Sequence, residues 1–143
     1  MTASNAIEKA EGEPLRVAFV IPIRIQNRAN MGRPNSMLAG ILAKKRDRSE
    51  HQSGCLHTRA ALARAGRKPY EIVPAVVTLT RVSAGHLDAH DGLPSCLKFV
   101  VDGIAEALGI DDGGPFVQWR YSQRKGPPKT HAVQVMIERI RLL

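Results

Sequence analysis

The sequence predicts a mixed α/β (α+β) domain, built on a small sheet of about four strands with two to three helices. Three observations predict it. Apolar and polar residues alternate in several short segments, as in strands with one buried face. One longer segment, residues 93–108, has apolar residues at helical spacing. The length of 143 residues suits one domain with a core of its own.

The N-terminal part predicts a tail, a strand and a loop. Residues 1–14 are polar and acidic without an apolar run, so they predict a disordered tail and not a signal peptide, and residues 15–143 are expected to form the domain. "LRVAFVIPI" (15–23) is rich in β-branched residues and predicts a strand that ends near Pro22. Asn, Gly, Pro and arginine residues then predict a loop over 24–35.

Two short helices are expected next. Ser36 can cap a helix over residues 37–48, whose last turns carry lysine and arginine. "HQSG" (51–54) is expected to break this helix. A second helix then covers residues 55–66 and stops at Gly66.

The remaining strands are predicted from alternation. A strand over 70–82 is expected to open after Pro69, with an edge or a bulge at Pro74, because proline cannot donate to a sheet ladder. Residues 115–123 and 131–140 alternate clearly and predict two further strands.

The long helix is predicted over residues 93–108. Pro94 suits a first helical turn and Gly109 suits a stop. Gly103 inside the pattern costs about 1 kcal/mol relative to alanine, so another segment is expected to pack closely there. The apolar positions of this helix are Leu93, Leu97, Val100, Val101, Ile104 and Leu108.

The charge indicates a polyanionic partner. The formal net charge is +8, from 21 Lys and Arg against 13 Asp and Glu. Residues 1–70 hold 13 basic and 5 acidic side chains, whereas residues 71–143 hold 8 of each. Nucleic acid is the commonest polyanion, and a merely solvated basic surface is the alternative. No run approaches the ~20 apolar residues that a membrane span needs, so no membrane partner is expected.

Acidic side chains gather around the long helix. Asp88 and Asp91 precede it, and Asp111 and Asp112 follow it. Clustered carboxylates stay ionised together most readily around a divalent cation, and Mg²⁺ prefers such oxygen ligands, with Mn²⁺ as a possible substitute. Helix capping and turn formation also favour aspartate at these places, and both interpretations stay open.

The same residues carry a family resemblance. The chain reads Leu-Asp-x-x-Asp-x-Leu, then a lysine five residues on, then Asp-Gly-Ile-x-x-x-Leu-Gly-Ile-Asp-Asp. This order resembles the RusA-type Holliday junction resolvases (crossover junction endodeoxyribonucleases), often carried by phages and prophages. The resemblance spans roughly residues 76–139 and takes in "VTLTR", "WRYSQRKG" and "AVQVMIE".

The resemblance implies a Mg²⁺-dependent nuclease site. Asp88 and Asp91 resemble the family's first pair of metal ligands. Asp112, or its neighbour Asp111, resembles the third ligand. Lys98 resembles the essential lysine, which would orient or offset charge on the scissile phosphate. The family acts as a homodimer on four-way junctions, so branched DNA and a second copy are the implied partners.

Two departures from the family pattern change the expected geometry. The first pair is spaced i and i+3 instead of i and i+2, so Asp88 and Asp91 converge only if the chain turns between them. Gly92 stands where the family has asparagine and would permit such a turn. His90 could replace one ligand, although exposed loop histidines are the simpler interpretation of His86 and His90.

Reach also limits the site. A helix over 93–107 is about 22 Å long, and the few residues after it span at most ~17 Å, so Asp112 cannot easily return to Asp91. Either the helix is shorter than its apolar pattern, or Asp112 arrives from another direction, for example across a homodimer.

Other candidates are weaker. His51, Cys55 and His57 include zinc-type ligands at irregular spacing. Trp119 and Tyr121 share one face of a strand, where core packing competes with a role in stacking DNA bases. The cysteines, with no export signal, are expected to be reduced in a cytoplasmic, nucleoid-associated protein.

Basic side chains in three stretches are the expected phosphate contacts, positioning DNA without reading its sequence. They are Arg24, Arg28, Arg33, Lys44, Lys45, Arg46, Arg120, Arg124, Lys125 and Lys129. The expected function is a structure-selective endonuclease that resolves branched DNA in recombination and repair. A catalytically decayed DNA-binding protein on the same fold is the main alternative, and an RNA-binding accessory protein is a third.

Overall fold

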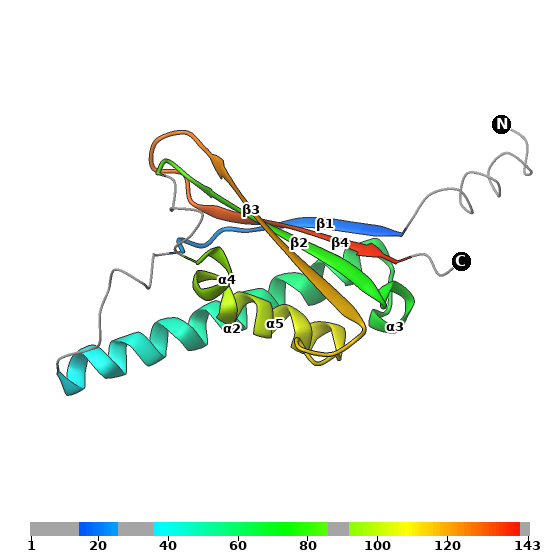
Figure 1. Ribbon diagram of the computed structural model, residues 1–143, viewed down its shortest axis with the longest axis horizontal. Helices are drawn as coiled ribbons and strands as arrows, with labels where there is room; N and C mark the ends of the chain where they lie inside the picture. Colours follow the sequence, from blue (N-terminus) through cyan, green and yellow to red (C-terminus); the bar gives the residue numbers. More distant parts are fainter. Residues whose placement is uncertain (1–14, 26–35, 86–91, 141–143) are drawn as a thin grey trace, which may run out of the picture.

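A mixed four-stranded sheet is the centre of the described fold (Figure 1). The computed structural model describes residues 15–25, 36–85 and 92–140. Strand order in the sheet is β1-β4-β2-β3, with β4 antiparallel to both β1 and β2, and β3 parallel to β2. The strands are β1 (Arg16–Ile21), β2 (Ala75–Ser83), β3 (Val117–Lys125) and β4 (Ala132–Arg139). The predicted α+β class with about four strands is confirmed.

Helices cover one face of this sheet. The described helices are α2 (Met37–Ala65), α3 (Pro69–Ile72), α4 (Leu93–Cys96) and α5 (Lys98–Leu108). The two longest, α2 and α5, pack against each other, and Figure 1 shows them on the same side of the strands. Four helices are described where two to three were expected, and two of the four, α3 and α4, are single short turns.

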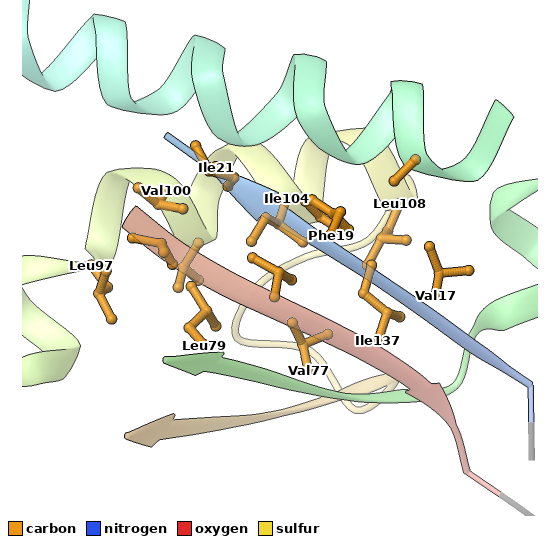
Figure 2. Close-up of a cluster of buried hydrophobic side chains, with 14 of the residues drawn as sticks. Val17, Phe19, Ile21, Val77, Leu79, Leu97, Val100, Ile104, Leu108 and Ile137 are labelled. Carbon is orange, nitrogen blue, oxygen red and sulfur yellow. The ribbon is translucent and has the colours of Figure 1, made fainter. Parts of the chain in front are cut away.

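The core lies between the sheet and these helices. Alternate residues of each strand face the helices, and residues spaced along α5 face the strands, as Figure 2 shows. The side chains with no exposed surface include Ile21, Leu79, Leu97, Ile104 and Ile137. The opposite face of the sheet holds a shallow hollow of about 400 Å³ whose lining side chains, from Ala18 and Thr78 to Met136, include no ionisable group.

The α2 helix is continuous, so the predicted break at "HQSG" is wrong. It runs for 29 residues, and the predicted cap is confirmed, since the Ser36 Oγ accepts a hydrogen bond from the Ala39 amide at 3.0 Å. Gly66 ends the helix in the left-handed conformation with φ 67°, as predicted. Gly54 lies inside the helix at a place where α5 packs directly against the α2 backbone.

Two glycines let α2 and α5 cross closely. A Cβ added to Gly103 would come within 2.1 Å of the His51 carbonyl oxygen, and one added to Gly54 within 2.5 Å of the Val100 carbonyl oxygen. No side chain fits at either place. The expected close packing at Gly103 is confirmed, and the partner is the very segment that was expected to break α2.

The segment around Pro74 also differs from expectation. Residues Pro69–Ile72 form the short helix α3, and the strand begins only at Ala75. Pro74 precedes β2, so the hydrogen-bonded ladder of that strand contains no proline and needs no bulge. Strand β2 lies inside the sheet, between β4 and β3, so the predicted edge or bulge at Pro74 is wrong.

The predicted helix 93–108 is divided at Leu97, where φ is −97° and ψ is 2°. The chain remains nearly helical there, because the Leu97 amide still bonds to the Leu93 carbonyl and the Val101 amide to the Leu97 carbonyl. Lys98 therefore begins α5, and Gly109 ends it with φ 69°.

In the described residues, no helix is both long and apolar enough to span a membrane. The cysteines, Cys55 and Cys96, are both buried and form no disulfide.

Candidate metal and nucleic-acid site

Asp102 and Asp112 form the acidic pair of the described structure. Asp102 lies in α5, one helical turn after Lys98, and Asp112 lies in the turn that follows the helix. The two carboxyl groups lie close enough for Asp112 to raise the pKa of Asp102. Lys98 and Asp102 are four residues apart and share a face of the helix. The Lys98 ammonium group therefore lies near the two carboxyl groups.

The turn after α5 returns Asp112 to the helix. Gly109 takes the left-handed conformation, and its amide and that of Ile110 bond to the Glu106 and Ala105 carbonyls. The chain therefore reverses beside the last turns. This explains how Asp112 reaches α5 despite the short connection: it meets the middle of the helix, and not its start.

Side chains of β3 hold the returning turn. The Trp119 indole Nε1–H donates a hydrogen bond to the Asp112 carbonyl oxygen at 2.8 Å. Tyr121, two residues on, shares this face of the strand, and both rings pack against the core. The core-packing interpretation of the two aromatic residues is therefore confirmed, and they also flank the acidic pair.

Burial and the neighbouring Asp112 set the ionisation of Asp102. Burial raises the pKa of Asp102 above its usual value, and the hydrogen bond and charge of Asp112 raise it further, while Lys98 and His51 oppose the shift. The pKa of Tyr121 is also raised, first by burial and then by the negative charges of Asp112 and Asp102. A carboxyl group whose ionisation is opposed by a neighbouring carboxylate is a place where a cation can bind.

Asp111 and Asp112 have different roles in the turn. The Asp111 carboxylate accepts a hydrogen bond from the Gly113 amide at 3.2 Å, and the Asp111 carbonyl oxygen accepts one from the Gly114 amide. Asp111 therefore stabilises the turn, whereas Asp112 pairs with Asp102. Of the two aspartates left open by the sequence, Asp112 is the one in the acidic pair.

A second polar cluster joins α2 to α5 nearby. Glu106 is 2.8 Å from the His51 Nε2 and also accepts a hydrogen bond from Cys55. The hydrogen bond from His51 is the main reason that the pKa of Glu106 is lowered, whereas burial raises the pKa of the Cys55 thiol. The cluster ties the two helices together beside their glycine crossing.

The zinc candidate is not formed. The His57 Nδ1–H donates to the Ser53 carbonyl oxygen at 2.8 Å, which keeps that ring within its own helix. Across the described ranges, no group of three or more His, Cys, Asp and Glu side chains is arranged to hold a metal ion. His51 and Cys55 instead share the Glu106 carboxylate.

The first predicted pair of acids cannot be placed. Asp88 and Asp91, with His86 and His90, lie outside the described residues, as do Arg28 and Arg33. The next described residue, Gly92, has φ 95° and ψ 60°. Because L-residues rarely adopt this conformation, the glycine there serves the backbone, as the sequence suggested.

The remaining basic candidates lie in separate places. Arg24 is exposed after β1, and Lys44 and Lys45 are exposed on the N-terminal half of α2, where Arg46 is half-buried. Arg120 and Arg124 are exposed on β3, on the sheet face opposite to Trp119 and Tyr121, while Lys125 and Lys129 are exposed at its end and in the following turn. The cationic side chains that act on Asp102 are Lys98 and His51, and neither belongs to this set.

Comparison with models of known protein families gave no match, and no characterised protein matches the chain significantly. The resemblance to the RusA-type resolvases therefore stays an interpretation of the motif.

Sequence reasoning missed Asp102 as a site residue. Asp102 lies within the quoted motif, but it was interpreted only as a position of the predicted helix and not as a ligand. Two signals could have found it: the four-residue spacing from Lys98, and Gly109, whose left-handed conformation reverses the chain and returns the aspartates to α5.

Proposed function

We propose that this chain is a metal-dependent endonuclease that cuts branched DNA as a homodimer. The observation that carries the proposal is the close approach of the Asp102 and Asp112 carboxyl groups, with Lys98 one helical turn before Asp102. A net charge of +8 supports a nucleic-acid substrate, and the RusA-like order of acids and lysine supports junction DNA among such substrates.

The residues present fit a hard divalent cation. Two neighbouring carboxyl groups cannot both be ionised without cost, so a bound cation would relieve their repulsion. Mg²⁺ accepts a few carboxylate ligands and keeps waters and phosphate oxygens for the rest, and Mn²⁺ can occupy similar sites. When bound, such an ion supplies a hydroxide nucleophile and neutralises charge on the phosphate. Asp88 and Asp91 are the proposed further ligands.

The chain's own groups would hold the substrate. Lys98 is exposed at the start of α5 and can contact the phosphate next to the acidic pair. Arg120, Arg124 and Lys125 on the adjoining edge strand β3 can contact flanking phosphates. Trp119 keeps Asp112 beside Asp102 through its hydrogen bond to the Asp112 backbone.

One observation favours a second function, DNA binding without cleavage. Gly92 carries no side chain to act as a ligand where the resembled family has asparagine, and its positive φ shows that it serves the backbone. A chain that has lost this group can keep the basic surface and the fold while its activity decays.

Cleavage of a synthetic four-way junction separates these functions. The nuclease predicts paired nicks with Mg²⁺ and none with EDTA. Because Asp112 is in the acidic pair, Asp112→Asn should lower the cleavage rate by roughly 100-fold or more. The matched Asp111→Asn variant keeps a side-chain oxygen that can accept the Gly113 amide and should stay within about ten-fold of the wild type. Tight, salt-sensitive binding without cutting in any metal would assign the chain to the second function.

A further inference from the structure

The hollow on the open face of the sheet has the size of a ligand site. Its volume of about 400 Å³ is within the range of pockets that hold small molecules or single groups of larger ones. In Figure 1 the helices α2 and α5 lie on the other face of the strands. Residues that are paired across β1, β4 and β2 line the hollow in two rows. The rows are Ala18, Met136 and Thr78, then Val20, Gln134 and Thr80.

The lining combines apolar walls with uncharged hydrogen-bonding groups. Val20 and Met136, which are 52% and 43% exposed, are the large apolar side chains that the described strands leave open to solvent. Thr78, Thr80 and Gln134 supply two hydroxyl groups and one amide, each able to donate and to accept. A buried charge without a partner is costly, so the group that enters this uncharged hollow should be neutral.

Positive charge lies beside the hollow, on the next strand. The Thr80 and Ser122 hydroxyl oxygens are 2.7 Å apart, and this hydrogen bond joins the rim of the hollow to β3. Arg120 and Arg124 come two residues before and two after Ser122, so they share its face of the strand. Both are exposed, and neither forms an ion pair with a described residue. A neutral hollow therefore adjoins two arginines whose charge is available to a ligand.

We propose that the hollow binds one unpaired nucleobase of a DNA strand, whose adjoining phosphates lie on Arg120 and Arg124. A nucleobase is flat and uncharged at neutral pH, with faces that pack on apolar groups and an edge of donors and acceptors. Val20 and Met136 would pack against the ring, and the Gln134 amide would hydrogen-bond to the edge. The backbone would follow β3, since neighbouring strands are only about 4.8 Å apart.

The inference deepens the proposed function and rests on it for the choice of DNA. A base must leave its stack before it can enter a pocket, and this costs least where the base is already unpaired. A branch point offers such bases. The hollow would then hold the strand through a base, on the sheet face opposite to the acidic pair.

Other occupants fit the lining less well. A protein partner would need a wider apolar surface than two exposed side chains provide. An inorganic anion would find no cationic group among the residues that line the hollow. A single nucleotide has the same base, but it brings fewer phosphates to the two arginines, so a strand should bind more tightly.

Binding of a short single-stranded DNA, measured by fluorescence anisotropy in EDTA, tests the proposal without cleavage. A matched abasic oligomer keeps the sugars and phosphates but lacks the bases. The wild type should bind the DNA at least about five-fold more tightly than the abasic oligomer. Gln134→Leu should remove most of this difference and leave the salt dependence of affinity unchanged, because the phosphate contacts remain. The matched Gln118→Leu, on the same sheet face but outside the hollow, should keep the difference.

A second variant fills the hollow without removing a hydrogen-bonding group. Ala18→Phe should have the same effect as Gln134→Leu, and the circular dichroism spectrum shows whether each variant is folded. Equal affinity of the wild type for the two oligomers, or equal effects of Gln134→Leu and Gln118→Leu, would overturn the proposal. So would a mononucleotide that competes as well as the strand. Because the assay needs neither metal nor cutting, it can succeed where junction cleavage fails, and the reverse.

Discussion

At the scale of single residues, the proposed metal site depends on the ionisation of Asp102. Its folded-state pKa is raised by burial and by Asp112. A carboxyl group whose pKa is raised on folding contributes stability that is present below the unfolded pKa and is lost as the pH rises through the folded pKa. The acidic pair should therefore weaken the metal-free protein at neutral pH, which is a common property of functional sites.

Asp102→Asn should remove this dependence. We expect the variant to be at least as stable as the wild type at neutral pH, because it replaces a carboxylate that repels Asp112 with a neutral amide. On acidification the wild type should gain relative to the variant. Urea unfolding of both proteins from mildly acidic to neutral pH measures the difference, and a difference that does not change with pH would contradict the assignment.

At the scale of elements, the crossing of α2 and α5 explains both a failure and a success of the sequence. "HQSG" resembles a helix break because serine and glycine favour turns, and local propensity alone supports that expectation. The close contact with α5 overrides it, and this contact joins residues about fifty positions apart. Gly103 was predicted to mark close packing, but its partner could not be known from spacing.

Gly103→Ala tests the crossing. The added Cβ would approach the His51 carbonyl oxygen to 2.1 Å, so the helices must separate, and we expect a loss of about 1–3 kcal/mol in the free energy of unfolding. Gly40→Ala is the control, because its Cβ meets nothing within 4 Å in its own chain and should add about 0.5–1 kcal/mol. Both are measured by denaturant unfolding at a low concentration, where the chain is monomeric. Equal effects would contradict the described crossing.

The strands were predicted more accurately than the helices. A run rich in β-branched residues indicated β1, and alternation indicated β3 and β4, each to within about two residues. The start of β2 was predicted too early, because a proline inside an apolar run is typical of a bulge within a strand. In the structure α3 comes first, and the strand starts after Pro74. Sheet order cannot be obtained from alternation, because β4 is inserted between β1 and β2.

At the scale of the whole molecule, charge and topology separate the proposed tasks. The acidic pair lies by the edge strand β3, on the helix side of the sheet, and the exposed Lys44 and Lys45 lie on the N-terminal half of α2. The sequence predicted Asp112, after the helix, and Lys98, within it, as candidate site residues. Asp102 was missed because only the folded turn at Gly109 brings Asp112 back to it.

DNA binding should use basic residues from both ends of this arrangement. Each lysine or arginine that contacts a phosphate makes affinity depend more steeply on salt, so replacing Lys44 and Lys45 together with glutamine should reduce the magnitude of the slope of log K against log salt by about 1–2. Replacing Arg120 and Arg124 should do the same. Junction binding measured by fluorescence anisotropy at several salt concentrations tests this, and an unchanged slope in both variants would place the DNA elsewhere.

The central claim is that Asp102 and Asp112 together bind a divalent cation. Its most direct test is a Mg²⁺ titration followed by the carboxyl ¹³C NMR signals of the aspartates. The account predicts that the Asp102 and Asp112 signals shift together and saturate, that the Asp111 signal changes far less, and that Asp112→Asn abolishes the shift of Asp102. Signals of Asp102 and Asp112 that stay unchanged at saturating Mg²⁺ and Mn²⁺ would contradict it.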